Sequence, residues 1–108
     1  MYELKDLHTV DFSKVDYYMQ MHTVIRDSLN FPDYYGGNWD AFWDCITDMY
    51  GEKINIEILS YDRVREKFGK NAEMLPMLLM RFKHNYNDEY CDDISVKIQD
   101  GDSIYYLD

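Results

Sequence analysis

Cysteine is scarce in this 108-residue chain, which contains only Cys45 and Cys91. Two cysteines do not make a disulfide framework, and their spacing matches no metal-ligand motif. Long apolar runs are also absent, and the N-terminus does not resemble a secretion signal. We therefore expect a cytoplasmic protein with reduced thiols, no metal and no cofactor. Both cysteines are interpreted as small hydrophobic residues rather than nucleophiles.

Positive charge is also in short supply, because 11 basic residues stand against 21 acidic ones and the formal net charge is −10. Such a surface repels nucleic acids and anionic membranes, and it attracts basic partners. Taken alone, the charge fits a role in solubility equally well. The sequence also lacks a phosphate-binding glycine loop, a nucleophile elbow and a histidine cluster. An enzyme is therefore not supported.

Two segments alternate apolar and polar side chains, at residues 53–59 and 94–99. This period of two predicts strands with one buried face. Residues 2–7 show a weaker strand pattern. The strand–helix–strand order predicts parallel pairing, and Asp100–Gly101 predicts a hairpin turn into an antiparallel edge strand over residues 103–107.

Helical periodicity predicts four helices, over residues 14–29, 39–49, 62–68 and 72–84. Ser13 and Asp16 form a capping-box pattern at the start of the first helix. Asn38 is a strong N-cap for the second helix, which Gly51 would end. We expect Asn71 to cap the fourth helix, and Pro76 to kink that helix or shorten its start.

These elements combine into one α/β domain over residues 1–108, with a three-stranded parallel sheet, helices mainly on one face and an additional antiparallel edge strand. The 46% hydrophobic content suits a globular domain of this kind. His22 lies on the apolar stripe of the first helix, where we expect it to be packed and hydrogen-bonded rather than catalytic. The apolar residues of the last helix are expected to be core as well: Met74, Met77, Leu78 and Met80.

The second helix places a carboxylate on each successive turn, at Asp40, Asp44 and Asp48. Carboxylates four residues apart repel, at about 0.2–0.5 kcal/mol per pair, so this face is suited to a positive partner. The helix dipole explains Asp40 in the first turn, but it gives no reason for Asp44. A general acid–base pair is disfavoured, because both side chains point the same way from a convex helix without an evident cleft.

Aromatic residues surround this acidic face. Tyr34 and Tyr35 precede the helix, and Trp39 and Trp43 border it. Aromatic side chains next to concentrated charge are typical of binding hot spots in protein interfaces. We nevertheless expect at least two of the four to pack inside the protein.

The segment FPDYYGGNWDAFWDCIT at residues 31–47 strongly resembles the barstar family of intracellular ribonuclease inhibitors, whose pattern is L-P-x-Y-Y-G-x-N-x-D-A-L-W-D-C-L-T. The resemblance implies a three-stranded parallel sheet with helices. It also implies that the loop and second helix occlude the active site of a secreted basic ribonuclease, with helix carboxylates in the place of RNA phosphates. Cys45 and Cys91 resemble the two reduced cysteines of the family.

The same resemblance implies a set of partner-binding residues. Asp44 matches the central acidic anchor, and Asp40 matches a second acidic contact one turn earlier. Tyr34 matches the aromatic residue that stacks on the enzyme. Flanking interface positions are matched by Gly36, Asn38, Trp43 and Thr47.

The chain departs from the family pattern at two positions and in a C-terminus that is longer by a turn and a strand. Met49 stands where members can have a tryptophan, and the last helix offers Arg81 or His84 where a glutamate is expected. The leading hypothesis is an immunity protein that binds a basic ribonuclease, or a related nuclease toxin, in a 1:1 heterodimer. The alternative is an acidic interaction module whose basic partner is not a ribonuclease.

Overall fold

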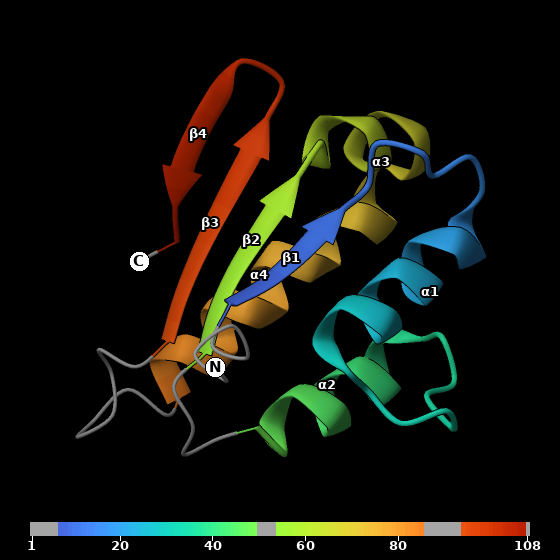
Figure 1. Ribbon diagram of the computed structural model, residues 1–108, viewed down its shortest axis with the longest axis vertical. Helices are drawn as coiled ribbons and strands as arrows, with labels where there is room; N and C mark the ends of the chain where they lie inside the picture. The colour runs from blue at the N-terminus through green and yellow to red at the C-terminus, as the bar shows by residue number, and fades with distance from the viewer. Residues whose placement is uncertain (1–6, 50–53, 86–93, 108) are drawn as a thin grey trace.

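The computed structural model describes residues 7–49, 54–85 and 94–107, and its strands form one twisted sheet (Figure 1). The strand order is β1 (Leu7–Asp11), β2 (Ile54–Leu59), β3 (Ile94–Asp100) and β4 (Ser103–Tyr106). The first three strands pair in parallel, and β4 pairs with β3 in the antiparallel direction. The parallel sheet and the added edge strand are both confirmed.

The described residues also form four helices, α1 (Tyr18–Leu29), α2 (Trp39–Thr47), α3 (Tyr61–Phe68) and α4 (Lys70–Asn85). Figure 1 shows α4 behind the sheet, with α1 and α2 on the side of β1. The strands bury every second side chain, as Ile56 and Val96 show, and leave neighbours such as Asn55 and Lys97 half-exposed. Helices on one face of the sheet were therefore predicted correctly.

The first strand lies further along the chain than predicted. It begins at Leu7, and residues 2–6 fall outside the described part of the structure. Its inward side chains include His8, which is buried and hydrogen-bonded through Nδ1 to the carbonyl oxygen of Ser28 at 3.0 Å. Because a polar histidine occupies an inward position, the sequence does not show the apolar–polar alternation by which strands were predicted.

The prediction for the start of the first helix was also wrong. α1 begins at Tyr18, and Ser13 instead donates its backbone N–H to the Asp11 carboxylate at 2.9 Å in a turn. Gln20 supplies the cap, because its Oε1 accepts the backbone N–H groups of Asp16 and Tyr17 at 2.7 and 3.2 Å. A side chain that reaches back three residues takes the place of the expected serine.

α3 and α4 are separated by Gly69, as expected, but α4 starts at Lys70, so Asn71 is not its cap. Pro76 lies inside the helix and has not shortened its start. Proline lacks the N–H that would bond to the carbonyl four residues earlier, which is Ala72. The hydroxyl of Tyr61 donates to that carbonyl oxygen at 3.2 Å and so satisfies it.

Replacement of Tyr61 by phenylalanine should therefore lower the free energy of unfolding by about 1–2 kcal/mol, because it leaves a buried carbonyl without a donor. Urea unfolding at pH 7 measures this. Tyr105→Phe, on the edge of the sheet, is the matched loss of a hydroxyl and should cost less than half as much. Equal stability of Tyr61→Phe and the wild type would contradict this role for the hydroxyl.

Candidate functional site

The loop before α2 ends in a helix cap. Asn38 Oδ1 accepts the backbone N–H of Ala41 at 2.8 Å, and α2 begins at Trp39, as predicted. The helix ends at Thr47, two residues earlier than expected, and Gly51 lies outside the described residues. The cap fixes the direction in which the first turn of α2 leaves the loop.

Two aspartates of α2 and a third at its C-cap lie on the solvent side of the helix. Asp40, Asp44 and Asp48 are exposed, whereas Phe42 and Ile46 on the opposite side are fully buried. Within the described part of the chain, none of these carboxylates forms a hydrogen bond or an ion pair. The acidic face is thus available to an external cation without first breaking an internal contact.

The four aromatic residues divide between core and surface. Tyr34 is 81% exposed, whereas Tyr35 is buried and Trp39 and Trp43 are half-buried. Packing of at least two of the four was expected and is confirmed. Tyr34 is thus the aromatic side chain of the loop that a partner can reach most freely.

A buried histidine connects α1 to this loop. His22 Nδ1 is 2.6 Å from the hydroxyl oxygen of Tyr35, and its Nε2 is 3.1 Å from that of Tyr18. The His22 ring also packs against Trp39, with ring centroids 4.6 Å apart. Burial lowers the pKa of His22 to about 4 and raises that of Tyr35, so both side chains are neutral at pH 7. The expected packed, hydrogen-bonded histidine is confirmed.

The loop also packs closely on α1 through a glycine. Gly37 has φ +71°, and a Cβ there would lie 2.5 Å from Cε of Met19. Gly36, the position matched to the family interface, has no positive φ and is exposed. Glycine is therefore required by conformation and by space at Gly37, one residue after the matched position.

The other residues compared with the family pattern differ in their surroundings. Thr47 donates its hydroxyl to the carbonyl oxygen of Trp43 at 2.8 Å, inside α2. Met49 is partly buried against the core. The thiol of Cys45 has a pKa raised by burial and by the nearby Asp48, which suits a small packed residue rather than a nucleophile. Cys91 lies outside the described residues.

A groove of about 540 Å³ separates α2 from α4. Its lining comes from both helices: Trp39, Asp40, Trp43, Asp44, Met74, Met77, Leu78 and Arg81. The expectation that Asp40 and Asp44 stand on a convex helix without a cleft is therefore wrong. The groove cannot be seen from the sequence of α2, since half of its wall comes from a helix some 35 residues later in the chain.

The α4 wall also corrects the prediction that its apolar residues are all core. Leu78 is buried, but Met77 and Met80 are 46% and 39% exposed. Arg81, one of two candidates for the position where the family has glutamate, lines the groove, whereas His84 does not. The missing glutamate was the only feature of the sequence that indicated a contribution of α4 to the site.

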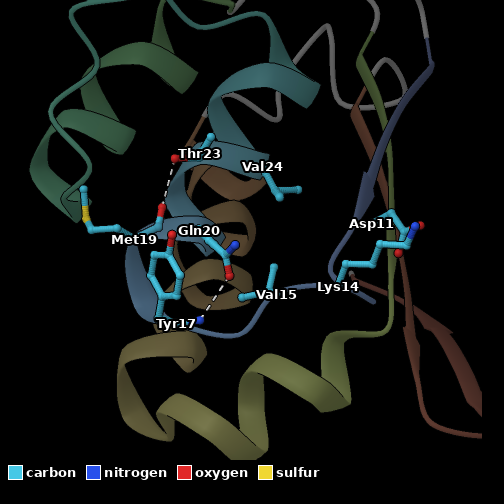
Figure 2. A pocket seen from close by; sticks show the side chains of 8 residues that line it. All are labelled: Asp11, Lys14, Val15, Tyr17, Met19, Gln20, Thr23 and Val24. Carbon is cyan, nitrogen blue, oxygen red and sulfur yellow. Dashed lines mark hydrogen bonds between the residues drawn. The ribbon is translucent and has the colours of Figure 1, made fainter.

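A second hollow, of about 510 Å³, lies along α1 and the turn that precedes it (Figure 2). It is lined by Asp11, Lys14, Val15, Tyr17, Met19, Gln20, Thr23 and Val24. None of the predicted partner-binding residues contributes to it. Among the described residues, no three His, Cys, Asp or Glu side chains are placed to hold a metal ion, and no helix is long and apolar enough to cross a membrane.

The fold and the site together define a small α/β protein whose second helix presents carboxylates and aromatic side chains at the edge of a groove. Residues 6–99 match the family described as Barstar (barnase inhibitor), and the chain belongs to this family. It is 28% identical over 80 residues to a protein of Bacillus subtilis (strain 168) named "Putative ribonuclease inhibitor YrdF". That alignment covers 74% of this chain and 85% of the relative.

Proposed function

We propose that this chain, as a single domain, is a cytoplasmic immunity protein that binds a cognate toxic ribonuclease and occludes its basic active site in a 1:1 complex. Membership of the barstar family and the name of the Bacillus relative support an inhibitor of ribonuclease. The observation on which the proposal depends most is the exposed pair Asp40 and Asp44, whose carboxylates have no partner among the residues that the structure describes.

In this proposal the carboxylates of α2 occupy the place of RNA phosphates. Asp44, the central anchor, would meet several cationic side chains of the enzyme at once, and Asp40 would meet a further one. Charge-assisted hydrogen bonds to arginine are short and strong, which offsets part of the cost of removing the carboxylate from water. Because neither carboxylate forms an ion pair in the described part of the chain, no such pair has to be broken there before these contacts form.

The loop residues would frame the acidic contact. Tyr34 would stack on the enzyme, with Trp43 beside the acidic face, and the flanking positions are Gly36, Asn38 and Thr47. The hydrogen bond between Tyr35 and His22 ties the residue after Tyr34 to α1. A loop held in this way loses less conformational entropy on binding than a free one, which favours tight association.

One observation favours a second candidate, an acidic interaction module whose basic partner is not a ribonuclease. The last helix offers Arg81 or His84, and no glutamate, where the family resemblance implies a glutamate. A partner other than a ribonuclease could select such a change. The two candidates differ in a simple respect, since only the first predicts an effect on RNA hydrolysis.

The test is RNA hydrolysis by a panel of basic microbial ribonucleases that includes barnase and the basic ribonuclease fraction of the host organism. The proposal predicts that activity of at least one enzyme falls linearly with added chain and reaches its minimum at equimolar ratio. If the chain inhibits no enzyme of the panel but binds a basic protein without ribonuclease activity, the second candidate replaces the first.

A further inference from the structure

The groove between α2 and α4 combines an apolar interior with a cation on its α4 side. Met74, Met77 and Leu78 of α4 face Trp39 and Trp43 of α2 across it. Met77 is 46% exposed, although a long apolar side chain is more stable when removed from water. Part of the groove is therefore apolar surface that an incoming side chain can cover.

Arg81 differs from the other arginines of the chain. Each of the other three is paired with a carboxylate, as Arg26–Asp27, Arg63–Asp16 and Arg65–Asp100 at 3.0, 2.7 and 2.8 Å. Within the described residues, Arg81 forms no hydrogen bond or ion pair. Among the arginines, Arg81 alone has no carboxylate partner in the described part of this chain, whose net charge is −10.

Asp40 and Asp44 line the same groove, and they too have no partner within residues 7–49, 54–85 and 94–107. Opposite charges on the two walls therefore do not neutralise each other within the chain. A partner that fits this groove needs cations opposite α2, a carboxylate opposite α4 and an apolar group between them.

We propose that the α2–α4 groove receives an apolar side chain of the inhibited ribonuclease, and that Arg81 pairs with a carboxylate of the enzyme next to that side chain. This inference rests on the proposed function and adds specificity to it. The acidic face of α2 suits any basic active site. The α4 wall selects enzymes with an acidic residue beside that site and rejects those with a cation there, since like charges brought together oppose binding.

The ion pair proposed for Arg81 is tested with Arg81→Glu. Binding is measured to the ribonuclease that the wild-type chain inhibits most tightly in the panel. Lys67→Glu on α3 is the matched control, because Lys67 is exposed, lies outside the groove and undergoes the same charge change. Extra negative charge by itself speeds association with a basic enzyme. The control should therefore bind as tightly as the wild type or more tightly.

Arg81→Glu should instead raise the dissociation constant by about tenfold or more, because it replaces an ion pair with repulsion. Replacement of the paired acidic residue of the ribonuclease by lysine should restore tight binding of the Arg81→Glu variant. Tighter binding of Arg81→Glu than of the wild type would overturn the proposal, because a cation of the enzyme would then face α4.

The apolar part is tested with Met77→Ala, and Met80→Ala is its control on the same helix outside the groove. Met77→Ala should raise the dissociation constant roughly threefold to tenfold, and Met80→Ala should leave it unchanged. Equal effects of the two variants would overturn the apolar contact.

If the wild-type chain inhibits no ribonuclease, the proposed function and this inference both fail. If inhibition depends on Asp44 but not on Arg81 or Met77, only this inference fails.

Discussion

Replacement of Asp44 by alanine should weaken inhibition of the ribonuclease by a factor of roughly 30 to several thousand, which corresponds to about 2–5 kcal/mol. The change leaves the cations of the enzyme buried against a methyl group, so the loss should appear mainly as faster dissociation. This range comes in part from charge pairs in the complex of barnase with barstar, the type complex of this family. Inhibition of RNA hydrolysis over a range of concentrations measures it.

The same variant should keep the fold, and the sign of its change in the free energy of unfolding distinguishes it from a folding defect. Asp44 repels Asp40 and Asp48 across successive turns, at about 0.2–0.5 kcal/mol per pair, and alanine is the better helix former. The free energy of unfolding of Asp44→Ala should therefore equal or exceed that of the wild type. Stability and affinity are expected to change in opposite directions.

Asp48→Ala is the matched control for Asp44→Ala, since it removes the same charge from the same face of the helix, one turn further on. As a residue at the rim of the interface, Asp48 should affect mainly the association rate, and modestly. If Asp44→Ala inhibits as well as Asp48→Ala does, the assignment of Asp44 as the central contact is wrong.

Acidification from pH 7 to pH 4 should cost the folded protein about 3 kcal/mol through His22 alone. Its ordinary pKa of 6.5 is lowered to about 4 by burial between Tyr18 and Tyr35. Above pH 6.5 the histidine is neutral in both folded and unfolded chains, so it has no effect. As the pH falls from 6.5 to 4, the unfolded chain binds a proton that the folded chain excludes, and stability is lost.

His22→Gln is the control for this pH dependence, because glutamine can donate and accept hydrogen bonds but does not titrate in this range. Urea unfolding of both proteins at pH 7, 6, 5 and 4 separates His22 from the many carboxylates, which titrate in both. The stability of the wild type should fall more steeply than that of His22→Gln, by about 3 kcal/mol in total. Parallel curves would show that His22 is not held neutral by burial.

The sequence predicted those elements in which a local signal agrees with the packing. Asn38 caps α2 as expected because its side chain reaches the backbone N–H of Ala41 within the same turn. The strands at Ile54–Leu59 and Ile94–Asp100 alternate apolar and polar side chains up to Ile58 and Gln99, respectively, so their buried face is evident from the residues alone. The family pattern at residues 31–47 then implied the fold, which the structure and the family match bear out.

The errors occur where a distant contact overrides the local signal. His8 takes an inward position in β1 because a carbonyl group of α1 is its hydrogen-bond partner. Pro76 is tolerated within α4 because Tyr61, on another helix, satisfies the carbonyl that proline leaves free. The groove likewise depends on the packing of α2 against α4. The exposure of Met77 is a result of that packing, so the helical periodicity of the sequence did not predict it.

The central claim is that α2 occupies the phosphate-binding site of a ribonuclease. The most direct measurement is binding of the wild-type chain to the inhibited enzyme in the presence of increasing amounts of a nonhydrolysable oligonucleotide. If carboxylates take the place of phosphates, the chain and the oligonucleotide exclude each other, and the apparent dissociation constant rises in proportion to the oligonucleotide concentration. A stable ternary complex of enzyme, chain and oligonucleotide would contradict the claim.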